Sequence, residues 1–163
     1  MPSPRVLLIE FNELAPGLID RFIDSGHLPN FSRLRDRSSC FVTDASEEVT
    51  LEPWTQWPTL HSGLPDTVHG IDQLGQADLL AGRGLARELT AAGHRVGVFG
   101  SMNIDSVSVN GGFFVPDPWS RGRCEPGSLQ DYYEFAASAI EEDSGEDLRR
   151  GLRRRLGKFV LGR

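Results

Sequence analysis

The apolar run at residues 6–9 (Val-Leu-Leu-Ile) constrains the fold most, because a short run of this kind is typical of a strand that is covered on both faces. Pro4 precedes the run and the polar pair Asn12 and Glu13 follows it, so we expect the strand to cover Val6–Phe11. Strands that are buried on both faces belong mainly to parallel sheets, in which helices connect the strands. The start of the chain therefore predicts a parallel sheet with helical connections.

Later segments continue this alternation. Apolar residues at helical spacing, bounded by proline or glycine, predict helices, and short β-branched or aromatic runs predict strands. One predicted helix starts at Pro16 and ends before Gly26, and a second starts at Pro29. Three further helices are predicted at Pro53–Ser62, Leu85–Ala92 and Leu129–Ile140. The further predicted strands are Cys40–Thr43, Arg95–Phe99 and Phe113–Val115. The expected fold class is α/β, with a largely parallel sheet flanked by helices on both faces.

The last part of the chain has a different charge pattern. Residues 149–158 carry five arginines and a lysine, while Leu148, Leu152 and Leu156 recur on the opposite helical face. We therefore divide the chain into an α/β core at 1–145 and a basic amphipathic C-terminal helix at 146–163. Such a helix either packs on the core with its arginines solvated or contacts an anionic membrane surface.

Composition limits the class of partner. The chain has 163 residues with a formal net charge of -6, and nucleic-acid binding needs a basic face to neutralise phosphates. We therefore expect no nucleic-acid partner. The run at 6–9 is too short for a signal peptide or a membrane span, which predicts a cytoplasmic protein. The oligomeric state stays open.

Polar residues stand at the end of the first predicted strand, where open parallel sheets bind ligands. Glu10, Asn12 and Glu13 offer carboxylate and amide oxygens, which suit a hard or borderline divalent cation. The alternative for Glu13 is an acid that leads the next helix and favours its positive N-terminus. These three residues are the candidate metal ligands.

The segment from Leu51 to Ile71 contains the second candidate site. A helix at Pro53–Ser62, closed by a left-handed Gly63, would present free backbone amides to an anion at its start. Thr55, or Thr50 just before the helix, would supply a hydroxyl nucleophile, which needs a nearby cation to lower its pKa. The alternative is that Thr55 bonds the backbone at a helix start.

Two histidines lie in the same segment. His61 is expected to be a surface or packing histidine, because it stands at the far end of the helix from the amides. His69 is expected to tie the turn at 68–71 to backbone carbonyls. Trp54 and Trp57 are interpreted as packing residues, since no basic groove accompanies them.

Four segments in order resemble the N-terminal part of the alkaline phosphatase superfamily, and more narrowly its type I phosphodiesterase and nucleotide pyrophosphatase branch. They are Val6-Leu-Leu-Ile-Glu-Phe-Asn-Glu13, Leu28-Pro-Asn-Phe-Ser-Arg-Leu34, Trp57-Pro-Thr-Leu-His-Ser-Gly63 with His69-Gly-Ile71, and Gly93-His-Arg-Val-Gly-Val-Phe99. The resemblance spans about residues 5–118. It implies an α/β sandwich of three layers and two divalent ions, usually zinc with manganese as an alternative, that activate a threonine or serine against a small phosphate or sulfate ester.

The chain also departs from the pattern of that family. Asn12 stands where the family has a metal-binding aspartate, and an ungapped count places Pro53, which has no hydroxyl, at the nucleophile position. The family takes its remaining metal ligands from later in a longer chain, whereas all four histidines here lie at or before position 94. The resemblance thus implies the front portion of a metal-dependent hydrolase.

Two other readings remain open. Replacement of the metal-binding aspartate and of the nucleophile is compatible with a catalytically inactive relative that binds an anion or a partner. A nucleotide-binding module is the third reading, on the basis of the segment from Gly93 to Gly100. That reading lacks a G-x-G-x-x-G segment after the first predicted strand, and a G-x-x-x-x-G-K-[ST] segment.

Overall fold

The structure is a computed structural model that describes residues 5–43 and 51–141. The chain divides into two compact units, residues 1–49 and residues 50–163, and each is considered by itself. The candidate Thr50 and the predicted basic helix at 146–163 lie outside the described residues. Among the described residues, no helix is long and apolar enough to cross a membrane.

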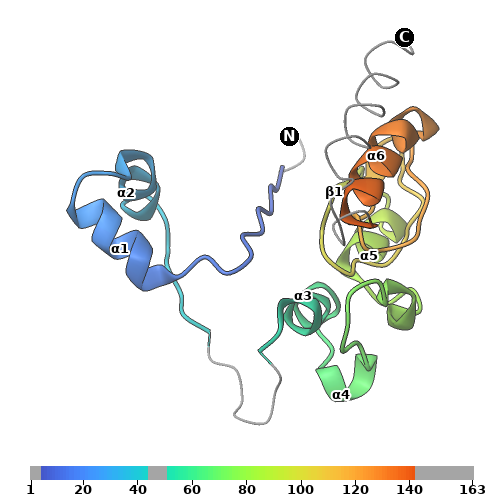
Figure 1. Cartoon of the computed structure of the whole chain (residues 1–163), viewed down its shortest axis with the longest axis horizontal. Coiled ribbons are helices and arrows are strands. Elements are labelled where there is room, and N and C mark those ends of the chain that lie inside the picture. Colours follow the sequence, from blue (N-terminus) through green and yellow to red (C-terminus); the bar gives the residue numbers. More distant parts are fainter. Residues whose placement is uncertain (1–4, 44–50, 142–163) are drawn as a thin grey trace. The chain divides into compact units, whose positions relative to one another are not determined.

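The first unit contains two helices, α1 (Pro16–Asp24) and α2 (Pro29–Arg35), which Figure 1 shows in blue. Each starts at a proline, whose missing N–H costs nothing in the first turn. Gly26 follows α1 with φ +76°, a left-handed conformation that glycine adopts without strain. Both predicted helices are confirmed.

The two strands that the sequence predicts in this unit are wrong. Residues 5–11 and 39–43 have neither helix nor strand, and Val6 and Val42 are 92% and 94% exposed. A strand needs a neighbouring backbone to complete its hydrogen bonds, and the described part of this unit holds no second strand for either segment. An apolar run is therefore not sufficient to predict a strand in either of these two segments.

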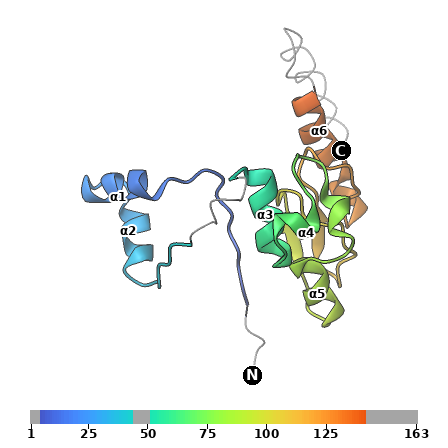
Figure 2. The same ribbon diagram turned by 90° about the horizontal axis from the view of Figure 1, so that it is seen from below.

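The second unit begins with helices. Its elements are α3 (Pro53–Ser62), α4 (Asp66–His69), the short 3-10 helix η1 (Ala77–Leu80), α5 (Leu85–Ala91), β1 (Gly97–Phe99), β2 (Phe113–Val115), the 3-10 helix η2 (Gly127–Leu129) and α6 (Gln130–Glu141). The predicted helix at Pro53–Ser62 and the predicted strand at Phe113–Val115 are confirmed with the same bounds. Helix α3 packs against α4, η1 and α5 (Figures 1 and 2).

The sheet of this unit consists of two parallel strands. Val98 of β1 lies beside Phe114 of β2, and both pack with Ala86 of α5 in one buried cluster. Val115, the next residue along β2, packs with Tyr133 of α6 in a second cluster. Because successive side chains of a strand point to opposite faces, the two clusters lie on opposite faces of the sheet. The described structure is therefore a mixed α/β protein with a small parallel sheet.

Gly112 permits the close approach that starts this sheet. Phe113 donates its backbone N–H to the carbonyl oxygen of Val96 at 3.1 Å. A Cβ atom on Gly112 would lie only 1.7 Å from the same oxygen. The residue before β2 must therefore lack a side chain.

Candidate functional site

Helix α3 holds the candidate nucleophile in its first turn. The carbonyl of Glu52 accepts hydrogen bonds from the backbone N–H groups of Thr55 and Gln56, both at 3.0 Å. Thr55 itself is 2% exposed, and its hydroxyl donates to the carbonyl of Ile71 at 3.2 Å. In this arrangement the Thr55 hydroxyl ties α3 to the segment after α4, and it would have to leave that bond before it could attack a substrate.

The segment from α3 to Ile71 is closed by two left-handed glycines, Gly63 and Gly70, both with φ +68°. Between them, His69 at the end of α4 connects the two helices. Its Nδ1 accepts the backbone N–H of Ile71 at 3.0 Å, and its Nε2 lies 3.0 Å from the hydroxyl of Thr59. Sequence reasoning expected His69 to reach backbone carbonyls, but its backbone partner is an amide.

These contacts define the protonation state of His69. An amide can only donate, so Nδ1 must be unprotonated, and Nε2–H then donates to Thr59, whose hydroxyl donates to the Thr55 carbonyl at 3.1 Å. Burial lowers the pKa of His69 from its usual 6.5; Asp66 acts against this effect, and Arg83 adds to it. The neutral imidazole is therefore part of the folded structure.

We expect acid to destabilise the second unit through His69. Because the folded pKa is lowered, the unfolded chain binds more protons below 6.5, and the stability contributed by neutral His69 is lost as pH falls from 6.5 through the folded pKa. Chemical denaturation of the parent and of His69→Asn at pH 7.5 and 5.5 checks this. The parent should lose more stability on acidification than the variant, and parallel losses would contradict this assignment.

His61 occupies the last turn of α3 and is 3% exposed. Its ring stacks on Trp57 with a centroid distance of 6.1 Å and an interplanar angle of 21°. Its Nε2 lies 3.1 Å from the hydroxyl of Ser101, the second residue after β1. The interpretation of His61 as a packing histidine is confirmed, and its polar contact with Ser101 was not foreseen.

Asn103, which is 0% exposed, is a buried link between loops that the sequence analysis missed. Pro58 lies inside α3 and has no N–H, so the carbonyl of Trp54 lacks its helical donor. The side-chain amide of Asn103 replaces that donor at 3.0 Å and also donates to the Gln73 carbonyl at 2.8 Å. Its side-chain oxygen accepts the N–H of Gln76 at 3.1 Å. A proline within a predicted helix was the available signal that a side-chain donor was needed.

Asp117 supports Asn103 from the end of β2. It is 1% exposed, and one carboxylate oxygen accepts the backbone N–H of Asn103 at 3.0 Å and the hydroxyl of Ser120 at 2.6 Å. The other oxygen accepts the backbone N–H groups of Trp119 and Ser120, each at 3.0 Å. The carboxylate is thus fully engaged within the protein, which indicates a structural role.

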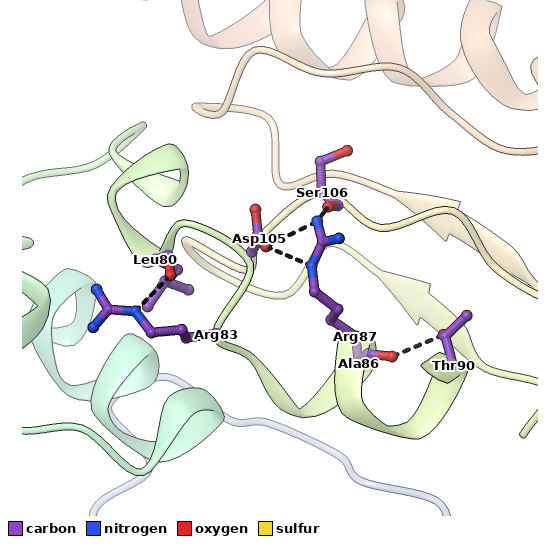
Figure 3. Close-up of polar contacts among 7 residues, drawn as sticks. All are labelled: Leu80, Arg83, Ala86, Arg87, Thr90, Asp105 and Ser106. Atoms are coloured by element: carbon purple, nitrogen blue, oxygen red, sulfur yellow. Dashed lines mark hydrogen bonds and ion pairs between the residues drawn. The ribbon is translucent and has the colours of Figure 1, made fainter. Parts of the chain in front are cut away.

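An arginine of α5 joins that helix to the loop after β1 (Figure 3). Arg87 forms an ion pair with Asp105 at 3.3 Å and donates to the carbonyl of Ser106 at 2.9 Å. In the same view Arg83 donates to the carbonyl of Leu80 at 3.1 Å. Both arginines therefore make contacts within the protein that hold these loops in place.

The candidate metal ligands lie in the first unit. Glu10 is half-buried, while Asn12 and Glu13 are exposed in a turn, with Glu13 in the left-handed region at φ +58°. Within residues 5–43 and 51–141, no three His, Cys, Asp or Glu side chains gather where they could hold a metal ion. Two carboxylates and one amide oxygen fit part of a coordination sphere for a hard or borderline cation, and further ligands would have to complete it.

Comparison with known proteins adds no relative. No protein-family model matches the chain, and neither a curated protein nor a solved structure matches it.

Proposed function

We propose that this chain is a segment of a metal-dependent hydrolase that acts on small phosphate or sulfate esters, of the alkaline phosphatase type. The observation that supports the proposal is the local structure of residues 53–71. Helix α3 starts at Pro53 and is closed by a left-handed Gly63, and the His69-Gly-Ile71 turn begins at the last residue of α4. This is the order of elements that the resemblance in sequence implies.

The proposal assigns the nucleophile to Thr55, with Thr50 as the other candidate hydroxyl. Thr55 lies in the first turn of α3, close to the backbone amides that attract an anion at a helix start. For Thr55 to react, its hydroxyl must turn from the Ile71 carbonyl toward the bound ester. The fold proposed with this function is a three-layer sandwich with a largely parallel sheet.

The proposal assigns the divalent cation, zinc or manganese, to the oxygens of Glu10, Asn12 and Glu13. When bound, such a cation lowers the pKa of a hydroxyl or water and stabilises negative charge on the ester. The neutral amide of Asn12 is the weakest of the three donors, because it brings no charge to the cation. The two glutamates therefore supply the negative charge that attracts the cation to the candidate site.

We expect Asn12→Asp to raise the affinity for zinc and manganese about tenfold, because ligand charge tunes the affinity of oxygen sites for cations. Isothermal titration calorimetry of the parent, of Asn12→Asp and of a Glu10→Gln, Glu13→Gln double variant measures this effect. The double variant should lose binding. Equal affinities across the three proteins, or no heat from any of them, would argue against these ligands. Asp36→Asn, a change at an exposed carboxylate of the same unit, is the matched control.

A second candidate function is a catalytically inactive relative that binds an anion or a protein partner. The observation that favours it is the engagement of Thr55, which is 2% exposed and donates to Ile71. Asn12 and Pro53 add to this reading, because they replace the groups that the chemistry needs most. Binding of inorganic phosphate or sulfate without turnover of their esters would select this second function.

A further inference from the structure

Ser101 and His61 form a second pair of chemically active side chains, independent of Thr55. Ser101 lies just beyond the carboxyl end of β1, the edge at which parallel sheets present reactive groups. The approach of the His61 Nε2 to the Ser101 Oγ, 3.1 Å, is within the range of a nucleophile and its base. The serine is half-buried, while the histidine is 3% exposed.

The surroundings hold this pair in a defined geometry. Stacking on Trp57 fixes the plane of the His61 ring. The turn that carries Ser101 is bounded by two left-handed residues, Gly100 at φ +63° and Asn103 at φ +49°. Asn103 is locked by its bonds to the Trp54 and Gln73 carbonyls, so the turn cannot relax freely.

A donor for a developing negative charge lies next to the serine. Within the part of the chain that the structure describes, the backbone N–H of Met102 makes no hydrogen bond. In serine hydrolases with a nucleophile on a sharp turn after a strand, the N–H of the following residue stabilises the oxyanion. Here Met102 directly follows Ser101, so its backbone N–H has the same place in the sequence relative to the serine.

We propose that Ser101 is an acyl-accepting nucleophile with His61 as its general base, acting on carboxylic esters without a metal ion. The Ser101 Oγ forms a bond to the carbonyl carbon, and the bond from that carbon to the alcohol oxygen breaks. The Oγ proton passes to His61 Nε2 and from there to the leaving alkoxide. Water then cleaves the acyl-serine with the same base, which releases the carboxylic acid.

The test uses p-nitrophenyl acetate and the full chain in the presence of EDTA, so its outcome is separate from that of the metal-dependent hydrolysis. We expect a burst of p-nitrophenolate and an acetyl group that peptide mapping places on Ser101. Ser101→Ala and His61→Gln should each slow acetylation about 100-fold or more, which is the scale of a lost nucleophile or base. Ser108→Ala, at an exposed serine of the same loop, should leave the rate unchanged.

His61→Gln alters a buried residue, so thermal unfolding of each variant accompanies the rate measurements. Ser101→Cys supplies a second readout: the new thiol should react with iodoacetamide faster than exposed Cys40 of the same chain, because His61 would favour its thiolate. No acetyl group on Ser101 in the parent, or a new thiol that reacts more slowly than Cys40, would overturn the proposal.

Discussion

Gly112→Ala is expected to destabilise the second unit by about 3 kcal/mol or more, the upper range for overpacking at a site that cannot yield. The added Cβ would lie 1.7 Å from the carbonyl oxygen of Val96, which already accepts the N–H of Phe113 at 3.1 Å. Relief of the clash requires separation of β1 from β2, so the sheet and both clusters packed on it would be lost. Chemical denaturation monitored by tryptophan fluorescence measures the change.

Gly127→Ala is the matched control. A Cβ there meets no atom within 4 Å, and the residue has no left-handed φ. Substitution at such a glycine stabilises by about 0.4–1 kcal/mol through the unfolded chain. Equal stabilities of Gly112→Ala and Gly127→Ala would show that residue 112 does not lie against the carbonyl oxygen of Val96.

Asn103→Ala is expected to lower stability by about 3 kcal/mol, because two carbonyls and one amide in a partly buried site lose their partners. An unpaired polar group costs about 1–3 kcal/mol when it is buried, and the lower end of this range applies to each of the three. The carbonyls are those of Trp54 and Gln73, and the amide is that of Gln76. For a unit of this size the loss corresponds to a fall in Tm of about 12 to 24 °C. Differential scanning calorimetry measures it.

Asn110→Ala controls for the removal of an asparagine amide. Asn110 is exposed and makes one side-chain bond, to the carbonyl of Thr90 at 2.8 Å. We expect its loss to cost about 0.5–1.5 kcal/mol, the net contribution of one hydrogen bond. An Asn103→Ala variant that was no less stable than Asn110→Ala would show that Asn103 is not the buried link between these loops.

Local patterns predicted longer helices such as α1 and α3, since their signals lie in adjacent residues. The short helices α4, η1 and η2 were not predicted. Pro53 and Gly63 mark the start and end of α3, and the structure has both bounds where the sequence placed them. The short strand at Phe113–Val115 was also predicted, because its apolar run is followed by the turn-forming Pro116. Such signals act within one or two turns of the chain and need no tertiary partner.

Contacts between distant residues were harder to predict. The apolar segment 6–11 has the composition of a buried strand, but strand formation depends on a neighbouring backbone that composition does not specify. The partners of the Asn103 side chain lie 27 to 49 residues away, and no local pattern connects them. Pro58 was the one local signal of such a contact, because a proline inside a helix leaves a carbonyl without its N–H donor, and another group must donate to that carbonyl.

Hydrolysis of p-nitrophenyl phosphate and p-nitrophenyl sulfate, with zinc or manganese added and with EDTA, distinguishes a metal-dependent ester hydrolase from an inactive relative. We expect turnover that requires the metal ion and is lost in Thr55→Val, which keeps the side-chain shape but removes the hydroxyl. Thr90→Val, which removes a hydroxyl bonded to Ala86 within α5, should retain turnover. Metal-dependent turnover that survived Thr55→Val would rule out Thr55 as the nucleophile, and the absence of turnover with both esters would rule out the proposed hydrolase function.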